Sequence, residues 1–341
     1  MSEERQNSEA RLFLRFLWAV AAGSLLLMLA VNYFSDRYYV FHPRGDAFLE
    51  VLEPNTRVLK AAVLEERCDS FDTVIMGSSR AAVYRTGDLD RAFGSRAFNF
   101  GVATGSLPDI LDRLEWLDEL GCMPRRIVLP LSIDRLRFTA RPNDLLRKEY
   151  PAIVGEAAYR REFLLSYLGI DAFFSNLRAL WEKRVKRPPA RFQYNLASGD
   201  VEYLWDRNLE FPPCPGEEMR ADPVTLDRYA DYLARIRDLA VAGGSELVLF
   251  WNPIPLAGQL AHVDDARALF DHIGGFTREI YRVPLDDPRL TDGSAFHDKG
   301  HFKPELAASV YEDSENRVSP AQLLDELAAA RSTCPGLPAV P

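Results

Sequence analysis

The longest uninterrupted apolar stretch of the chain lies close to its N-terminus. Residues 16–35 contain no charged side chain, and twenty such residues coiled as a helix are long enough to cross the apolar core of a bilayer. No face of this helix would be polar, so a buried helix of a soluble domain fits the pattern poorly. We expect a transmembrane helix at 16–35, preceded by a cytoplasmic N-terminus at 1–15 and followed by a membrane-proximal connector at 36–65.

A cleaved signal peptide is the main alternative for this segment. The apolar region of a signal peptide is normally about 7–15 residues long and closes with small residues at a cleavage site. Here the run ends in the sequence VNYF at 31–34, and aromatic residues are typical of the interfacial ends of membrane helices. The sequence therefore favours an uncleaved signal anchor. The flanking charges leave its orientation open, because basic residues stand on both sides, at Arg5, Arg11, Arg15, Arg37 and Arg44.

Beyond residue 65, short apolar runs alternate with amphipathic stretches. This alternation is typical of a parallel sheet with helices on both faces, and it predicts an α/β domain at 66–341. The expected strands are 73–76, 97–100, 126–131, 247–251 and 283–285, and the expected helices are 106–120, 226–242 and 263–281, the last broken at Gly274-Gly275. In 106–120 apolar residues recur at helical spacing, so one face of that helix should pack on the sheet.

An insertion of about a hundred residues, 137–244, separates the third and fourth expected strands. It is much longer than a crossover of about a dozen residues, and we expect it to be helical. Its aromatic residues are more typical of a helical core than of a substrate platform; they are Tyr150, Tyr159, Phe163, Tyr167, Phe173, Phe174 and Trp181. The basic cluster KRVKR at 183–187 is either a solvated face or a contact with anionic lipid headgroups.

Composition narrows the class of protein. The formal net charge of -9 argues against a nucleic-acid partner, because phosphate binding needs a basic face. There is no Gly-rich phosphate loop and no Cys/His spacing typical of zinc, so neither a cofactor nor a metal is expected. The five histidines are scattered, which disfavours the alternative of a metal-dependent hydrolase.

The four cysteines form two candidate pairs. Cys68 precedes the first expected strand and Cys122 the third, so both would lie at the same edge of a parallel sheet. A disulfide there would fit an oxidising compartment, while two unpaired buried thiols fit the sequence equally well. Cys214 and Cys334 are the other candidate pair.

Two short segments more than two hundred residues apart carry candidate chemistry. Residues 72–80 read as a buried strand that runs into a tight turn with Ser79, and Asp298 and His301 stand three residues apart near the end of the chain. A serine hydroxyl needs a neighbouring imidazole to take its proton, and the imidazole needs a carboxylate to fix its tautomer. Taken alone, the first segment is an ordinary turn and the second a helix-start contact. Both lie where an α/β sheet places its ligands, which favours a catalytic triad.

These segments resemble the motifs of the SGNH (GDSL-like) hydrolase superfamily. The sequence GSSR at 77–80 resembles the first block, and this makes the second serine, Ser79, the nucleophile. The sequence NFGVATG at 99–105 resembles the second block, whose glycine, here Gly105, offers a backbone N–H to the oxyanion. The sequence DKGHFKP at 298–304 resembles the last block, which supplies the acid and the base. Over about residues 70–310 the resemblance implies a flavodoxin-like three-layer sandwich with a parallel central sheet.

The third block departs from the family pattern. Where the family has Gly-x-Asn-Asp, this chain reads LSID at 131–134, and losing one oxyanion donor typically costs about 10²–10³ in rate. Besides the N–H groups of Ser79 and Gly105, the candidate donors are Ser132 and Asn99, although a local turn or strand-end hydrogen bond explains either residue. Arg80 is either a ligand for an anionic substrate group or a solvent-facing residue at a helix start.

Similar departures occur among membrane-anchored relatives in bacterial cell-surface polymer modification, such as alginate O-acetylation and teichoic-acid D-alanylation. The resemblance therefore implies transfer or hydrolysis of acyl groups, with acetyl expected, on an envelope polysaccharide through an acyl-enzyme. The domain would lie on the periplasmic side of a bacterial inner membrane, with a membrane-bound O-acyltransferase as donor partner. The alternative is a non-catalytic binding or assembly protein of polysaccharide export on a degenerate fold of the same kind.

Overall fold

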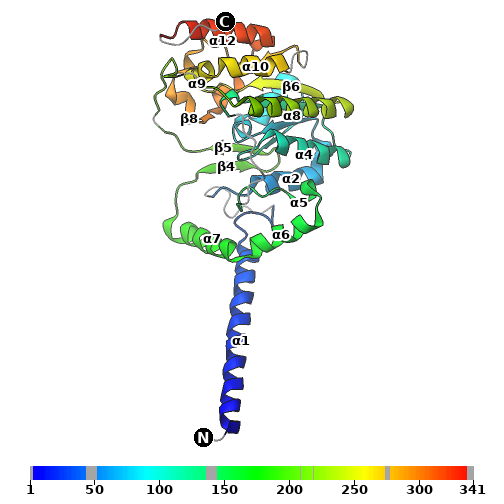
Figure 1. The fold of residues 1–341 in the computed structure, drawn as a ribbon, viewed down its shortest axis with the longest axis vertical. Helices are drawn as coiled ribbons and strands as arrows, with labels where there is room; N and C mark the ends of the chain where they lie inside the picture. Colours follow the sequence, from blue (N-terminus) through cyan, green and yellow to red (C-terminus); the bar gives the residue numbers. More distant parts are fainter. Residues whose placement is uncertain are drawn as a thin grey trace.

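A single long helix, α1 (Glu3–Ser35), projects from an α/β body in the computed structural model (Figure 1). The structure describes residues 3–43, 52–135, 144–207, 209–217, 219–272 and 277–335. The part of α1 at Ser8–Ser35 is long and apolar enough to cross a membrane. Its large apolar side chains are exposed, with Leu26 at 67% and Phe34 at 78%. A helix with the length and composition expected for 16–35 is therefore present, and by these criteria it fits an anchor or a signal sequence.

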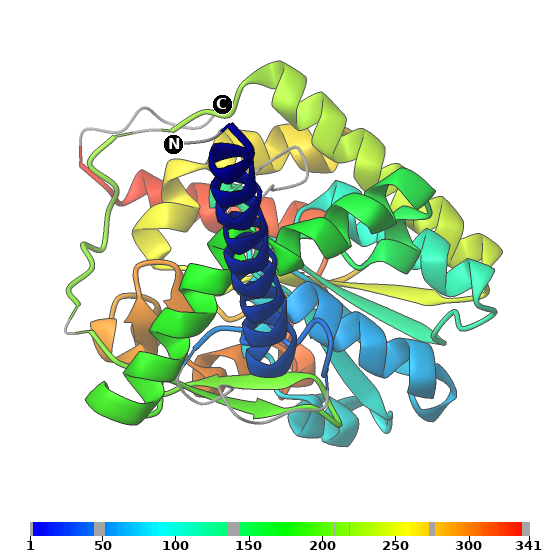
Figure 2. The ribbon, with the colours of Figure 1, turned by 90° about the horizontal axis from the view of Figure 1, so that it is seen from below.

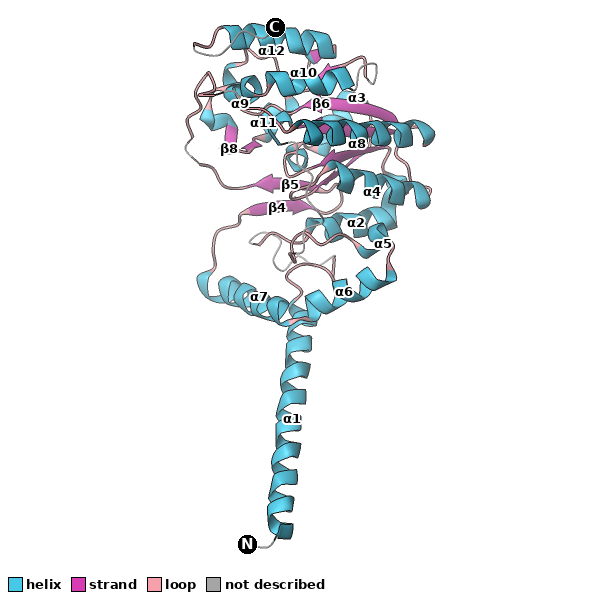
Figure 3. Cartoon of the chain, viewed as in Figure 1, coloured by secondary structure: helices cyan, strands magenta, loops and turns pink. Residues whose placement is uncertain are grey.

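A mostly parallel six-stranded sheet forms the centre of the body, in the order β10-β7-β6-β3-β1-β2 (Figure 3). Only β10, at one edge, runs antiparallel to its neighbour. Because β1 pairs with β2 on one side and with β3 on the other, the connections that leave β1 and β3 diverge at their carboxyl ends. The strands are β1 (Thr73–Gly77), β2 (Ala97–Gly101), β3 (Arg126–Leu131), β6 (Glu246–Trp251), β7 (Ile280–Tyr281) and β10 (Arg317–Val318).

Both faces of the sheet are buried under helices and loops. Along β1, Val74 and Met76 belong to one core and Ile75 to the other, the alternation of a strand covered on both sides. The first core is closed by α2 (Thr56–Arg67), α4 (Leu107–Glu119), α8 (Pro223–Ala242), α10 (Val263–His272) and α12 (Pro320–Ser332). The second core is closed by the short helical turn η2 (Ala81–Val83), α3 (Thr86–Phe93), α11 (Pro304–Ala308) and the segment around Phe296.

Four of the five expected parallel strands are present, and the fifth is misplaced. The strand expected at 283–285 is not formed, and β7 lies instead at Ile280–Tyr281, where Ile280 pairs with Leu249. Pro284 has no N–H to give to a sheet, which explains why pairing stops before it. The helix expected over 263–281 ends at His272, and the Gly274-Gly275 break lies outside the described residues.

The insertion expected at 137–244 is only partly helical. Its described part holds α5 (Pro151–Val154), α6 (Ala157–Leu168) and α7 (Ile170–Trp181), and then an antiparallel hairpin of β4 (Phe192–Asn195) and β5 (Asp200–Tyr203). The last segment, α8, packs into the first core and is part of the main domain. The aromatic residues also divide, because Phe163 and Tyr167 are buried while Phe174 and Trp181 are exposed.

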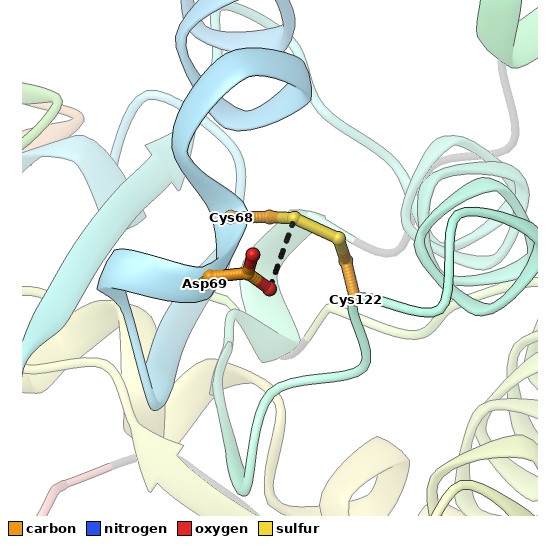
Figure 4. Close-up of side chains that lie close together, drawn as sticks. All are labelled: Cys68, Asp69 and Cys122. Carbon is orange, nitrogen blue, oxygen red and sulfur yellow. Dashed lines mark hydrogen bonds between the residues drawn. A yellow bond between two sulfur atoms is a disulfide. The ribbon is translucent and has the colours of Figure 1, made fainter.

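Both candidate cysteine pairs are disulfides. Cys68 and Cys122 join the amino ends of β1 and β3, opposite the edge that carries Ser79, with a Cα–Cα distance of 5.8 Å (Figure 4). Cys214 and Cys334 tie the insertion to the end of α12, with a Cα–Cα distance of 5.6 Å. Asp69 lies beside the first pair. That cluster offers no thiolate to a metal, because the two sulfur atoms are bonded to each other.

Candidate active site

Ser79 lies in a sharp turn immediately after β1. Gly77 ends the strand with φ 156°, and a Cβ there would lie 2.7 Å from the Cβ of Ala81. The second-block loop lies close to the same turn, because a Cβ on Gly105 would be only 2.3 Å from the carbonyl oxygen of Gly77. Glycine is therefore required at both positions for the backbone to pass. The turn places Ser79 at the carboxyl end of β1, next to the point where the connections that leave β1 and β3 diverge.

The three expected triad residues meet there. The Nε2 atom of His301 lies 2.8 Å from the Oγ of Ser79, and the Nδ1 atom of His301 lies 2.9 Å from Oδ1 of Asp298. Asp298 and His301 stand on β8 (Phe296–Asp298) and β9 (His301–Phe302), two short antiparallel strands, so the helix-start interpretation of this pair is wrong. The geometry is that of a nucleophile, a base and an orienting acid.

Asp298 is held as a carboxylate. Burial raises its pKa, but the hydrogen bond from the Gly300 N–H, 2.7 Å long, and the charge and hydrogen bond of His301 outweigh burial, and the pKa of Asp298 falls below its usual value. A charged acid on Nδ1 favours the tautomer in which Nδ1 carries the proton, so Nε2 is the nitrogen that can accept the proton of Ser79. His301 and Asp298 side chains are each 21% exposed, so the pair is open to a substrate.

The hairpin of the insertion forms an aromatic wall beside the triad. The ring of Tyr203 lies 5.5 Å from the His301 ring and 4.7 Å from the ring of Trp205, measured between centroids. His297, next to Asp298, bonds the Trp205 carbonyl through Nδ1 at 2.9 Å and so ties the hairpin to β8. Burial raises the pKa of Tyr203, so its phenol stays protonated. The sequence analysis did not predict this wall. The sequence feature that points to it is a pair of aromatic residues at alternate positions, Tyr203 and Trp205.

Arg80 does not face a substrate or the solvent. Its side chain is 3% exposed, and its two terminal nitrogens donate to the carboxylate of Asp134 at 2.5 and 2.7 Å. Its Nε donates to the carbonyl oxygen of Gly300 at 2.7 Å. Both interpretations of Arg80 from the sequence are therefore wrong. The guanidinium joins the nucleophile turn, the end of the third block and the loop between Asp298 and His301, which fixes the base relative to the nucleophile.

Asn99 is not available as an oxyanion donor. It is fully buried, and its amide nitrogen donates to the carbonyls of Ala81 and Tyr84 at 3.0 and 2.7 Å. Its side-chain oxygen accepts from the Gly101 N–H at 2.8 Å. The amide nitrogen of Asn99 thus holds the turn after Ser79 and its side-chain oxygen holds the end of β2, so the local explanation of Asn99 is correct.

Gly105 and Ser132 differ in what they have left to donate. The N–H of Gly105 bonds the carbonyl of Val102 at 3.2 Å, within its own turn. The hydroxyl of Ser132 accepts from the amide of Asn252 at 2.7 Å, which leaves its own hydrogen as a donor. The backbone N–H of Ser79 has no acceptor among the residues that the structure describes. In this arrangement Ser79 and Ser132 are better placed to donate to an oxyanion than Gly105 and Asn99.

A cluster of buried charged side chains packs against the second-block loop, residues 101–105. Arg57 and Arg113 are 1% and 0% exposed, and both bond Glu149, at 2.7 and 2.5 Å. Arg57 also bonds Asp109 at 3.0 Å, and the two arginines hold the pKa of Asp109 below its usual value although burial raises it. Lys60 donates to the Gly101 carbonyl at 2.7 Å, and burial lowers the pKa of Lys60 to about 7. The loop between Gly101 and Gly105 is thus held in place by buried charged side chains that are bonded to one another or to the loop.

Replacing Asp134 with asparagine is expected to reduce the free energy of unfolding by about 1.5–3 kcal/mol, the range for a hydrogen bond to a charged group. The reason is that Arg80 would stay buried with its charge uncompensated. Urea unfolding measures the change, and Asp144→Asn is the matched control, because its pair with Arg147 is 46% and 40% exposed. Equal changes in the two variants would contradict a structural role for the Arg80–Asp134 pair.

The chain matches no protein-family model, no curated protein and no solved structure at a significant level. Its motifs and the geometry of the site are therefore the basis for a function.

Proposed function

We propose that the protein is a membrane-anchored serine esterase or O-acyltransferase of the SGNH type, acting on acyl groups of an extracytoplasmic polysaccharide or another envelope polymer. The observation that carries the proposal is the hydrogen-bonded series from Asp298 through His301 to Ser79. The serine and histidine are 222 positions apart in the chain. A relay of this kind joins the groups that a nucleophilic serine requires.

The topology also supports this proposal. The parallel strands in the order β2-β1-β3-β6-β7 follow the 2-1-3-4-5 order of flavodoxin-like doubly wound folds. In such folds ligands bind at the carboxyl ends of the strands, where neighbouring connections diverge. Ser79 and Ser132 follow the two strands that flank this point, β1 and β3.

The proposed chemistry is a double displacement through an acyl-enzyme. As the Ser79 oxygen bonds to the acyl carbonyl carbon, His301 Nε2 takes the hydroxyl proton, and Asp298 stabilises the imidazolium. The Ser79 N–H and the Ser132 hydroxyl would meet the oxyanion. His301 then returns its proton to the departing alcohol oxygen, leaving the acyl group on Ser79. In the second half His301 takes a proton from water or from a sugar hydroxyl, whose oxygen bonds to the acyl carbon. The bond between that carbon and the Ser79 oxygen breaks, and His301 returns the proton to Ser79, which gives hydrolysis with water or transfer with the sugar.

The location of the protein is part of the proposal. With α1 in a bacterial inner membrane, the body would lie on the periplasmic side, where the two disulfides are favoured. Tethering raises the effective concentration of the site at a membrane-borne donor, which suits a transferase supplied by a membrane-bound O-acyltransferase. The aromatic wall at Tyr203 would limit the access of water to the acyl-enzyme.

Transfer and hydrolysis are separated by measuring both with the full-length protein in lipid nanodiscs. We expect hydrolysis of small acyl esters well below the ordinary enzyme range of about 1–10³ s⁻¹. We also expect a Ser79→Ala strain to lose acyl groups from a surface glycan. Ser78→Ala is the matched control, because it removes the neighbouring hydroxyl, which lies outside the triad.

The other outcomes are equally specific. Ester hydrolysis at ordinary rates with unchanged glycan acylation in the Ser79→Ala strain would indicate a plain membrane-anchored esterase. A glycan whose export fails without the protein but is normal with Ser79→Ala would indicate the non-catalytic assembly protein. Either result would overturn the transferase.

A further inference from the structure

The helices α6 and α7 lie directly against the carboxyl end of α1. They meet at Gly169, whose carbonyl accepts a hydrogen bond from the Asn32 side chain at 2.9 Å. Asn176 on α7 donates to the same Asn32 side chain at 3.1 Å. Figure 1 shows α7 and α6 on opposite sides of the upper end of α1, at the bottom of the body, and Figure 2, seen from below, shows the green insertion helices extending to either side of α1. The three helices therefore form one connected unit.

The position of this junction along α1 sets its depth. Asn32 precedes the last residue of α1, Ser35, by three positions, which is about 4.5 Å along a helix axis. A span at 16–35 fills the apolar core of a bilayer, so the junction lies close to the boundary between acyl chains and headgroups. With α1 in a bilayer, helices that extend sideways from this point would lie along the surface of the membrane.

One face of α7 exposes large apolar side chains. Ile170, Phe174, Leu177 and Trp181 are spaced three or four residues apart and are 60%, 62%, 40% and 49% exposed. These four residues are called the apolar stripe below. The buried residues of the same helix are the small or polar Ala172, Asn176 and Ala179. This is the reverse of a helix on a soluble domain, whose apolar side faces the core.

Positive charge accompanies the apolar stripe. Directly after it, the segment 183–187 exposes Lys183, Arg184, Lys186 and Arg187, and the ammonium of Lys186 lies 4.6 Å from the Trp181 ring centroid. Residues 157–187 contain seven basic and three acidic side chains, in a chain with a net charge of -9. A helix with apolar and aromatic residues beside lysine and arginine is typical of an element that lies in the interface of an anionic membrane.

We propose that α6 and α7 form a second membrane contact, in which the apolar stripe enters the boundary of the acyl chains and the basic cluster at 183–187 binds anionic lipid headgroups. The partner is the lipid surface itself. This inference shares with the proposed function only the insertion of α1, and it does not depend on catalysis. Two contacts, one spanning and one lying flat, would fix the height and tilt of the active site above the bilayer.

Spin labels on the full-length protein in nanodiscs of zwitterionic and anionic lipid test this contact. The native cysteines are in disulfides, so a thiol label reacts with an introduced cysteine: Phe174→Cys on the apolar stripe, or Val241→Cys on α8 as the matched control, 69% exposed. Power saturation compares access to oxygen, which enters lipid, with access to a water-soluble nickel chelate. We expect the label at 174 to lose most of its access to nickel and the label at 241 to keep it.

Charge reversal of the basic cluster tests the headgroup contact. In anionic nanodiscs, Lys183→Glu, Arg184→Glu and Lys186→Glu together should restore nickel access at position 174. A label at 174 as accessible to nickel as the label at 241 would overturn the proposal, because it would place the apolar stripe in water and not in lipid. A label at Leu26→Cys on α1 that reports water would overturn it as well, by removing the membrane anchor, while the ester chemistry of Ser79 would be untouched.

Discussion

Replacing Ser79 with alanine is expected to lower the rate of acyl-ester turnover by a factor on the order of 10⁴–10⁶, as for the loss of other serine nucleophiles. The hydroxyl oxygen is the atom that bonds to the acyl carbon, and its only nearby base in the proposed mechanism is His301, at 2.8 Å. Without that oxygen no acyl-enzyme forms, and turnover falls to what the remaining binding groups support.

The measurement is single-turnover release of the alcohol from an activated ester by full-length protein. Ser78→Ala should stay close to the wild-type rate, although it alters the same turn. The fold should survive in Ser79→Ala, because the change removes one partly exposed hydrogen bond, worth about 0.5–1.5 kcal/mol. Turnover in Ser79→Ala equal to that in Ser78→Ala would contradict the assignment of the nucleophile.

Replacing Glu149 with glutamine is expected to lower the free energy of unfolding by about 3–5 kcal/mol, the cost of breaking a buried ion pair. Glu149 is the shared partner of Arg57 and Arg113, and all three side chains are at most 2% exposed. Both arginines donate to Oε2 of Glu149, while Oε1 accepts from the Tyr150 N–H. Glutamine removes the negative charge, and its NH2 group must face either the guanidinium groups or that N–H, so one acceptor is lost in either orientation. Asp109 would then be the only acid bonded to Arg57 among the described residues.

Chemical denaturation measures this loss, with Glu115→Gln as the matched control. Glu115 pairs with Arg235 at 3.5 Å across the surface of α4 and α8, and the two side chains are 49% and 59% exposed. An exposed pair of this kind contributes about 0–1 kcal/mol. A loss in Glu149→Gln no larger than in Glu115→Gln would show that the buried cluster stabilises the fold no more than an exposed ion pair does.

The strands at the centre of the sheet could be predicted because both of their faces are buried. β1, β3 and β6 read as short continuous apolar runs, and this signal needs no knowledge of the neighbours. β7 could not be located in the same way. It has only two residues and is defined by its pairing with β6, so the apolar stretch around it fits more than one boundary.

The residues of the candidate site also fall into those that could be predicted from the sequence and those that could not. Ser79, Asp298 and His301 could be selected from the sequence because few residue types perform their chemistry and their spacing is informative. The Arg80–Asp134 pair could not, because an arginine after a strand is usually exposed, and its burial follows only from folding residues 54 positions apart onto one edge of the sheet. The position of the Tyr203 ring beside His301 likewise could not be predicted, because it depends on how the insertion folds back onto the domain.

The most direct test of the central claim is covalent labelling of the full-length protein with a fluorophosphonate, followed by mass spectrometry of the peptide that contains residues 72–80. The probe reacts with a serine oxygen only where a base has activated it. We predict a phosphonyl adduct on Ser79 that is absent in Ser79→Ala, retained in Ser78→Ala and strongly reduced in His301→Ala. An unlabelled Ser79, or labelling that persists without His301, would contradict a serine nucleophile activated by this triad.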